Sequence, residues 1–303
     1  MYFEKVYLHE SQGRKDVTLT CYVLDKSPEI PGSSIRPAVL ICPGGAYLGC
    51  SDREGEPVAM AFAAMGYHTF VLRYSTYNEG KGMSPVEVKD VKPHCVHPGP
   101  MKDIGAAMLF IKNHAAEWNL DAEKIAICGF SAGGHNCAMY SVYWDKPVLS
   151  EYAVRPAAAI LGYPLTDYLG LAEMVFEREK QENTEERSSG LFTQVSLAFL
   201  GTKNPSPQQL LEVSPPRLVD ANTPPTFIWF TAEDETVPVQ QAYAMANGLA
   251  NNNIPHELHV FEKGLHGMSL ATAASAGGPQ LINQDAAQWM PLCGAWLAKH
   301  FAM

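Results

Sequence analysis

Hydrophobic and polar residues alternate through two short segments at the start of the chain. In residues 17–24 the apolar side chains of Val17, Leu19 and Cys21 occupy every second position, and residues 2–9 alternate in the same way. Successive side chains of a strand point to opposite faces of its sheet, so this pattern is typical of half-buried antiparallel strands. We therefore expect an N-terminal hairpin at one edge of a sheet.

Later segments are continuous apolar runs, which suit strands buried on both faces of a parallel sheet. These runs are residues 37–42, 124–128, 156–164 and 224–231, and residues 67–74 and 256–261 are also expected to be strands of this sheet. Between them, apolar residues recur at spacings of three and four, which predicts helices. The expected helices cover residues 51–65 and 103–118, the segment after residue 131, and residues 242–249 and 289–297. The repeated order of strand, helix and strand predicts an α/β protein with a mostly parallel, doubly wound sheet.

Two segments interrupt this order. Residues 75–100 are rich in Gly, Pro and Lys and are expected to form a long surface loop that borders a site. Residues 173–190 carry many charged side chains, which favours a solvated helix over a place in the core. Because this stretch lies between two predicted strands, residues 168–215 are expected to form a small cap over the sheet. Residues 1–303 are thus predicted to be one domain with one insertion.

The composition limits the compartment and the partners. With 303 residues, 47% of them apolar, the chain can bury a large core without disulfides or metal. Its net charge of 22 − 32 = −10 disfavours nucleic acid and anionic membranes as partners. Seven cysteines without Cys-x-x-Cys spacing, and the lack of a signal-peptide pattern or a membrane-spanning run, predict a cytoplasmic protein unless a leader was trimmed. Homo-oligomer formation is left open.

A glycine-rich motif follows the apolar run 124–128 and precedes a predicted helix. It contains Ser131 and Ala132 between Gly129 and Gly133, which makes a Gly-x-Ser-x-Gly pattern. A sharp strand-to-helix turn leaves no room for side chains two residues before and after the serine, so both positions require glycine. The helix that follows directs free N–H groups, that of Ala132 first, toward negative charge that forms beside Ser131. The motif therefore predicts a nucleophile and part of an oxyanion hole.

Two further loops supply the groups that activate a serine. Asp234 follows the predicted strand 224–231, and His266 follows the predicted strand 256–261. A serine hydroxyl needs a base to take its proton, and the base needs a carboxylate on its other ring nitrogen. Because parallel strands end at the same edge of a sheet, we expect both side chains to meet Ser131 there. The order Ser, Asp, His is the one that the α/β-hydrolase fold imposes.

Several motifs together resemble those of a known family. They are Pro43-Gly-Gly-Ala-Tyr, Gly-Phe-Ser131-Ala-Gly-Gly-His, Ser214-Pro215, Pro224-Pro-Thr-Phe, Asp234-x-x-Val-Pro and Leu265-His266-Gly. From about residue 17 to its end, the chain resembles the α/β-hydrolase esterases grouped with hormone-sensitive lipase, and more narrowly their acetyl-esterase or acetyl-xylan-esterase-like branch. The resemblance implies the α/β-hydrolase fold, with Ser131 as nucleophile, His266 as base and Asp234 as the carboxylate that orients it.

The same resemblance implies that the N–H groups of Gly45, Ala46 and Ala132 form the oxyanion hole. Related lipases write this loop as His-Gly-Gly-Gly, whereas here Pro43 replaces the histidine and Ala46 replaces the last glycine. Backbone donors survive both changes. Which of Gly45 and Ala46 lies nearer to the oxyanion is left open.

Other side chains compete for the roles of acid and base. Glu233 and Glu235 flank Asp234, and only the Asp-x-x-Val-Pro match selects the middle carboxylate. His135 lies one helical turn after Ser131 and on the same helix face, but a core histidine explains it more simply.

Two tyrosines and one motif of possible metal ligands also allow a structural explanation beside a functional one. Tyr47 and Tyr163 follow strands at the predicted catalytic edge and are candidates for substrate binding, although buried tyrosines with one bonded hydroxyl are common. His94, Cys95 and His97 are residue types that bind metals, but no fourth ligand stands at a typical spacing. We therefore expect no metal and no other cofactor.

The sequence thus predicts a serine carboxylesterase that removes a short acyl group, acetyl above all, from a carbohydrate such as an acetylated xylo-oligosaccharide. The alternatives are an amidase or peptidase of the same fold, such as an arylformamidase, and an inactive binding protein. The charge of residues 173–190 suits a polar leaving group, so kcat/KM is expected to fall steeply from acetyl to butyryl esters. The apolar stretch Phe192–Leu200 would oppose this expectation if it faced the site.

Overall fold

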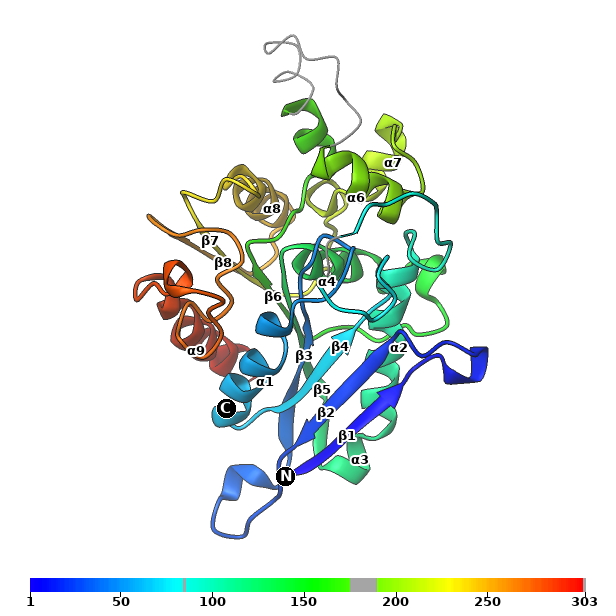
Figure 1. Cartoon of the computed structure of the whole chain (residues 1–303). Coiled ribbons are helices and arrows are strands. Elements are labelled where there is room, and N and C mark those ends of the chain that lie inside the picture. Colours follow the sequence, from blue (N-terminus) through cyan, green and yellow to red (C-terminus); the bar gives the residue numbers. More distant parts are fainter. Residues whose placement is uncertain (84–85, 175–189, 302–303) are drawn as a thin grey trace.

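One twisted sheet organises the molecule (Figure 1). The computed structural model describes residues 1–83, 86–174 and 190–301, and in these residues eight strands follow the order β1-β2-β4-β3-β5-β6-β7-β8. Their bounds are β1 Tyr2–Tyr7, β2 Thr18–Val23, β3 Arg36–Cys42, β4 His68–Arg73, β5 Leu120–Phe130, β6 Ala158–Gly162, β7 Thr226–Thr231 and β8 His256–Phe261. Strand β2 pairs antiparallel with β1 and β4, and all other neighbours are parallel. This confirms the predicted mostly parallel sheet with an antiparallel N-terminal hairpin.

Helices cover both faces of the sheet (Figure 1). Their bounds are α1 Glu56–Ala64, α2 Gly99–Asn113, α3 Ala115–Trp118, α4 Ala132–Tyr143, α6 Leu191–Leu200, α7 Pro207–Glu212, α8 Gln240–Asn251 and α9 Trp289–Phe301. Short 3-10 helices span Glu10–Gln12, Pro31–Ser33, Asp52–Glu54, Pro147–Leu149, Pro215–Arg217, Pro279–Leu281 and Ala286–Gln288. Helices α1 and α9 meet on one face through the rings of Phe62 and Trp289, 6.4 Å apart. Helices α2, α4 and α8 pack on the other face, because right-handed crossovers that run along the sheet toward β8 place their helices there.

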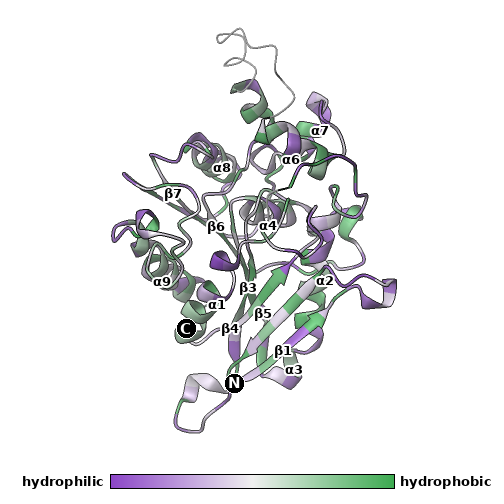
Figure 2. Cartoon of the chain, in the orientation of Figure 1, coloured by the Kyte–Doolittle hydropathy of each residue, from purple (hydrophilic) through white to green (hydrophobic). Residues whose placement is uncertain are grey.

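The core lies on both sides of the middle strands. Every residue of β6 and β7 is buried, as expected for continuous apolar runs in a parallel sheet. Figure 2 shows the middle strands mostly in the green of hydrophobic residues, with purple mainly on loops and outer turns. Trp229 of β7 stacks on Trp289 of α9 with ring centroids 5.2 Å apart. This stacking joins the sheet to the C-terminal helix.

Two predicted helices differ from the observed ones at proline-containing turns. The helix predicted over residues 51–65 divides at Gly55, whose angles of φ −101° and ψ −100° are not helical. Pro57 then stands in the first turn of α1, where its missing N–H costs nothing. The helix predicted over residues 103–118 begins earlier, at Gly99, and divides at His114 into α2 and α3. The first division matters for the site because it places Asp52–Glu54 at the carboxyl edge of the sheet.

The strand register brings the loops of the site together. Cys42 at the end of β3 pairs with Gly129 of β5, and Thr231 at the end of β7 pairs with Phe261 of β8. The loops that follow β3, β5, β7 and β8 therefore leave the sheet at one edge. These four loops carry the predicted oxyanion donors, nucleophile, acid and base.

Part of the predicted cap lies over this edge. Within residues 168–215, residues 168–174 are helical and α6 and α7 follow residue 190. Phe199 of α6 stacks on Tyr47, with ring centroids 3.9 Å apart, and its carbonyl accepts a hydrogen bond from the His97 N–H at 2.7 Å. Most of the charged stretch 173–190 lies outside the described residues. The division into one domain and one cap stays a prediction.

Two findings bear on the predicted compartment and partners. All seven cysteines are buried and none forms a disulfide. In residues 1–83, 86–174 and 190–301, none of the helices has both the length and the apolar character needed to cross a bilayer.

Three histidines make the stability of the fold depend on pH. Burial lowers the pKa of His68 and of His97 to about 4 and that of His135 to about 3. Below about pH 6.5 the unfolded chain takes up protons at all three rings while the folded chain does not, so acid favours unfolding. We expect the free energy of unfolding to fall by up to about 4 kcal/mol between pH 6 and pH 5 through these three groups.

Urea denaturation at pH 7, 6 and 5 measures this loss. A His68→Gln variant lacks one of these three titrating rings, so about a third of their pH-dependent loss should disappear whatever its stability at pH 7. An identical pH dependence in wild type and variant would contradict the assignment.

Candidate active site

Ser131 stands on a sharp turn between β5 and α4. Its backbone angles of φ 51° and ψ −120° belong to neither element. A Cβ atom added to Gly129 would lie 2.3 Å from the carbonyl oxygen of Gly133, and one added to Gly133 would lie 2.1 Å from that of Cys42. The Ser131 N–H donates to the carbonyl of Gly162 at 2.9 Å, which fixes the turn on β6. The turn therefore has the geometry of a nucleophile elbow, and both glycines are sterically required.

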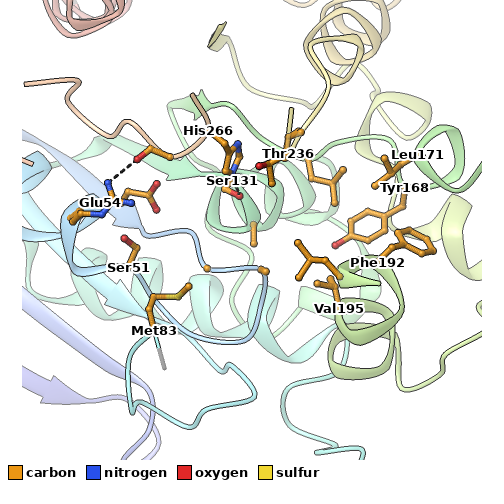
Figure 3. A pocket seen from close by; sticks show the side chains of 18 of the residues that line it. Ser51, Glu54, Met83, Ser131, Tyr168, Leu171, Phe192, Val195, Thr236 and His266 are labelled. Atoms are coloured by element: carbon orange, nitrogen blue, oxygen red, sulfur yellow. Dashed lines mark hydrogen bonds between the residues drawn. The ribbon is translucent and has the colours of Figure 1, made fainter. Parts of the chain in front are cut away.

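His266 lies beside Ser131 (Figure 3) and also contacts Asp234. Its Nε2 is 2.9 Å from Ser131 Oγ, and its Nδ1 is 2.7 Å from Asp234 Oδ2. Because a carboxylate accepts hydrogen bonds, Nδ1 carries the proton and Nε2 accepts from the serine hydroxyl. This tautomer is the one that a general base requires. The structure thus joins the three predicted residues in one hydrogen-bonded chain.

The choice of carboxylate follows from burial and from backbone donors. The Asp234 side chain is fully buried, whereas Glu233 and Glu235 are exposed. Asp234 Oδ1 accepts hydrogen bonds from the N–H groups of Thr236 at 2.9 Å and Val237 at 2.8 Å. Those two bonds hold the carboxylate still, so that its other oxygen meets His266.

The predicted oxyanion donors line the same cavity as Ser131. Gly45, Ala46 and Ala132 all contribute to its wall. Gly45 and Ala46 have φ values of 139° and 55°, and Tyr47 follows with 58°. This unusual backbone leaves the N–H groups of Gly45 and Ala46 without an acceptor among the described residues. The Ala132 N–H is the first of α4, and the first N–H groups of a helix have no acceptor within the helix.

Tyr47 supports the oxyanion loop from behind and is not among the described residues that line the cavity. Only 1% of it is exposed, and its hydroxyl is 2.6 Å from His135 Nδ1. The other ring nitrogen of His135 must donate to the carbonyl of Val213, 2.9 Å away, so Nδ1 accepts from Tyr47. Burial lowers the pKa of His135 to about 3, which keeps the ring neutral. The interpretation of His135 as a core histidine is confirmed.

Tyr163 also lies behind the site rather than in the described wall of the cavity. Its ring packs edge-on against His266, with centroids 5.0 Å apart, and only 2% of the residue is exposed. Its hydroxyl donates to Glu54 Oε1 at 2.6 Å and accepts from the Ser269 N–H at 2.8 Å. Both tyrosines suggested for substrate binding therefore act on the loops of the site, with no exposed face for a ligand.

Glu54 is a residue of the site that the sequence pattern does not single out. A charged residue in a predicted amphipathic helix is expected on its solvated face, yet only 3% of Glu54 is exposed and it lies in the cavity wall. The sequence did contain a signal, because Gly55 and Pro57 follow it directly and weaken a helix at that point.

A cavity of about 630 Å³ opens beside Ser131 (Figure 3). Figure 3 shows two unlike sides, with Ser51 and Glu54 to one side of Ser131 and Tyr168, Phe192 and Val195 to the other. The first side carries the polar Ser51 and Glu54, with Met83 beside Ser51 (Figure 3), and Asp52 and Arg53 also line the cavity. The second side is mostly apolar and carries Tyr168, Leu171, Phe192 and Val195, and Leu165 and Leu191 also line the cavity. The apolar stretch Phe192–Leu200 therefore does reach the site. This arrangement opposes the expectation of a narrow pocket that admits only acetyl groups.

The residues considered for a metal are engaged elsewhere. His94 lies 3.3 Å from Glu79, and the ring of His97 packs against Phe199. In the part of the chain that the structure describes, no group of three or more His, Cys, Asp or Glu side chains is arranged to hold a metal ion.

The sheet order, the elbow and the placement of the loops define an α/β hydrolase. MGS-M1, an α/β-hydrolase enzyme from a Medee basin deep-sea metagenome library, has a solved structure that is 33% identical and superimposes with a TM-score of 0.73, covering 100% of this chain and 99% of that one. Residues 27–249 match the BD-FAE family, and the chain belongs to that family.

Two further relatives carry more specific names. Endo-1,4-beta-xylanase B of Butyrivibrio fibrisolvens is 34% identical over 242 residues, which is 78% of this chain and 33% of that protein. The acetyl ester-xyloside bifunctional hydrolase of Caldicellulosiruptor lactoaceticus is 27% identical with a TM-score of 0.70, covering 93% of this chain and 88% of that one. The chain spans between 33% and 53% of the length of the curated relatives it matches.

Proposed function

We propose that this protein is a serine carboxylesterase that hydrolyses short-chain acyl esters of carbohydrates, acetyl esters among them. The observation that carries the proposal is the hydrogen-bonded chain from Asp234 through His266 to Ser131, which opens on a cavity with free backbone donors. The relative named as an acetyl ester-xyloside hydrolase, which the chain matches over most of both lengths, supports a carbohydrate ester as substrate.

The arrangement supports a two-stage reaction through an acyl-enzyme. The Ser131 hydroxyl passes its proton to His266 Nε2 as its oxygen bonds to the ester carbonyl carbon. The carbonyl oxygen then carries the negative charge, which the N–H groups of Ala132 and the Gly45–Ala46 turn stabilise. His266 returns the proton to the leaving alcohol as the carbon–oxygen bond breaks. Water repeats these steps and releases the acid from Ser131.

The two sides of the cavity suit the two halves of such an ester. Hydroxyl, carboxylate and guanidinium groups on the side of Ser51 and Arg53 match the hydroxyl groups of a sugar. The side of Phe192 and Val195 matches an acyl group, which gains up to about 0.8 kcal/mol for each methylene that it buries there. This wall revises the expected steep fall from acetyl to butyryl, because the acyl chain has apolar surface to contact.

We expect kcat/KM for p-nitrophenyl esters to stay level or rise from acetate to butyrate and to drop at octanoate, because acyl chain and alcohol share one cavity. A Phe192→Ser variant should lower the butyrate-to-acetate ratio by severalfold, since it removes apolar surface from the acyl side. If Phe192→Ser instead changed selectivity among alcohols at constant acyl group, the two sides would be reversed. Activity that keeps rising to octanoate would contradict a short-chain esterase.

The rates on an ester and on an amide distinguish the proposed esterase from an arylformamidase-like enzyme. Turnover of an acetylated xylo-oligosaccharide, together with far slower turnover of N-formylkynurenine, is the expected result. The opposite preference would favour an arylformamidase-like enzyme. Reaction of Ser131 with neither substrate nor a fluorophosphonate would leave only a binding protein.

A further inference from the structure

Glu54 is a buried carboxylate of the cavity wall that has no place in the chain of Ser131, His266 and Asp234. It ends the 3-10 turn Asp52–Glu54, and the break at Gly55 turns it toward the sheet edge. A buried carboxylate is unfavourable unless hydrogen bonds compensate its lost hydration. Its partners therefore indicate what it holds in place.

One oxygen of Glu54 holds the oxyanion loop. Oε2 accepts a hydrogen bond from the Gly44 N–H at 2.7 Å, and Gly44 directly precedes the proposed donors Gly45 and Ala46. A Cβ atom added to Gly44 would lie 2.8 Å from that same oxygen and 2.6 Å from the carbonyl oxygen of Phe130. The loop backbone thus lies directly on the carboxylate.

The other oxygen reaches the loop that carries the base. Oε1 accepts from the Tyr163 hydroxyl at 2.6 Å, and that hydroxyl accepts from the Ser269 N–H at 2.8 Å. Ser269 follows His266 by three residues, and its own hydroxyl donates to the Arg53 carbonyl at 2.6 Å. Tyr163 also packs against the imidazole of His266. Glu54 therefore connects the two loops from inside the protein.

Arg53 strengthens the same connection. Its Nη1 donates to the carbonyl of Gly267 at 2.8 Å, drawn as the dashed line in Figure 3. Gly267 follows His266 directly. The dipeptide Arg53-Glu54 therefore contacts the base loop through Gly267, through Ser269 and, by way of Tyr163, through the imidazole ring.

We propose that Glu54 is a positioning residue that holds the oxyanion donors and His266 in register with Ser131. The proposal rests on the proposed function of the site. Donors stabilise an oxyanion only when they lie within about 2.7–3.1 Å of the place where it forms, so a small shift of the loop weakens the transition state. The ground-state ester makes little use of these donors, so the effect falls on kcat and leaves KM nearly unchanged.

Glu54→Gln tests this role with little change in shape. The glutamine amide offers one oxygen where two donors, the Gly44 N–H and the Tyr163 O–H, now each have an acceptor. One loop therefore loses its anchor. We expect kcat to fall about 10- to 100-fold with KM within about twofold, as for a misplaced catalytic group. Tyr163→Phe removes the hydrogen bonds to Glu54 Oε1 and to the Ser269 N–H but leaves the Gly44 N–H on Glu54 Oε2, so it should give a smaller loss with the same pattern.

Asp103→Asn is the matched control. Asp103 is also buried, at 2% exposure, and its oxygens contact His9 Nε2 and the Ser75 N–H at 2.7 Å each, away from the cavity. The same chemical change there should lower Tm while leaving kcat unaltered. If Glu54→Gln and Asp103→Asn lost kcat equally, or if Glu54→Gln kept the wild-type kcat, the inference would be wrong. Should Glu54→Gln fail to fold, the kcat and KM of Tyr163→Phe decide in its place.

The rate of fluorophosphonate labelling of Ser131 separates this inference from the proposed function, since it needs nucleophile, base and oxyanion donors but no ester. If the wild type is labelled yet hydrolyses no ester, the esterase proposal fails and Glu54 is judged by labelling alone. Slower labelling of Glu54→Gln, but not of Asp103→Asn, then supports the inference, and equal labelling refutes it. A wild type that neither hydrolyses esters nor reacts with the probe would refute both.

Discussion

Ser131→Ala is expected to abolish ester hydrolysis while the fold is retained. The change removes one hydroxyl from a side chain that faces a cavity and that, among the described residues, hydrogen-bonds only His266. Losing a nucleophile costs up to about 10⁶ in kcat, whereas losing one oxyanion donor costs about 10²–10³. The two cases are therefore distinguishable in a single assay of p-nitrophenyl acetate.

Ser141→Ala provides the matched control for this variant. Ser141 lies in helix α4, which follows Ser131 directly, is buried, and donates its hydroxyl to the Cys137 carbonyl at 2.8 Å. It should lose little activity although the chemical change is identical. Substantial turnover by Ser131→Ala with an unchanged circular dichroism spectrum would remove Ser131 from the mechanism.

Asp234→Asn is expected to reduce kcat by about 10⁴. Its Oδ1 position still accepts from the Thr236 and Val237 N–H groups, which places the new amide nitrogen against His266. Because that nitrogen donates, the imidazole must present Nδ1 as an acceptor and move its proton to Nε2. The ring can then no longer accept the proton of Ser131.

The two glutamates beside Asp234 provide control variants for this prediction. Glu233→Gln and Glu235→Gln change carboxylates that face solvent. Neither should alter kcat by more than about twofold, as is usual for surface substitutions. A larger loss at Glu233 than at Asp234 would show that the orienting carboxylate was misassigned.

The sheet and the meeting of Ser131, Asp234 and His266 could be predicted because each depends on local sequence plus one rule of topology. Continuous apolar runs give buried parallel strands, and parallel strands end at one edge. Ser131 lies 135 positions from His266 in the sequence, and His266 lies 32 positions from Asp234. Their meeting can nevertheless be predicted without knowing how the side chains pack.

The other features of the site could not be predicted, because they depend on tertiary contacts that no local pattern encodes. The sequence pattern places Glu54 on the solvated face of a helix, but the break at Gly55 directs its side chain inward. Tyr47 and Tyr163 follow the correct strands, but their burial depends on α6 and on Glu54. The apolar wall at Phe192 and Val195 depends on how the cap segment docks, and periodicity in that segment says nothing of the direction it faces.

The position of β8 has a consequence for how activity relates to folding. Within the described sheet β8 is the terminal strand, with one parallel neighbour and side chains that are mostly half-buried, and it leads into the loop of His266. Elements with few buried contacts open locally at lower free-energy cost than the core. The nucleophile, in contrast, is held by the buried strand β5. We therefore expect the element that carries the base to open before the core, so that catalytic competence is lost while most of the sheet persists.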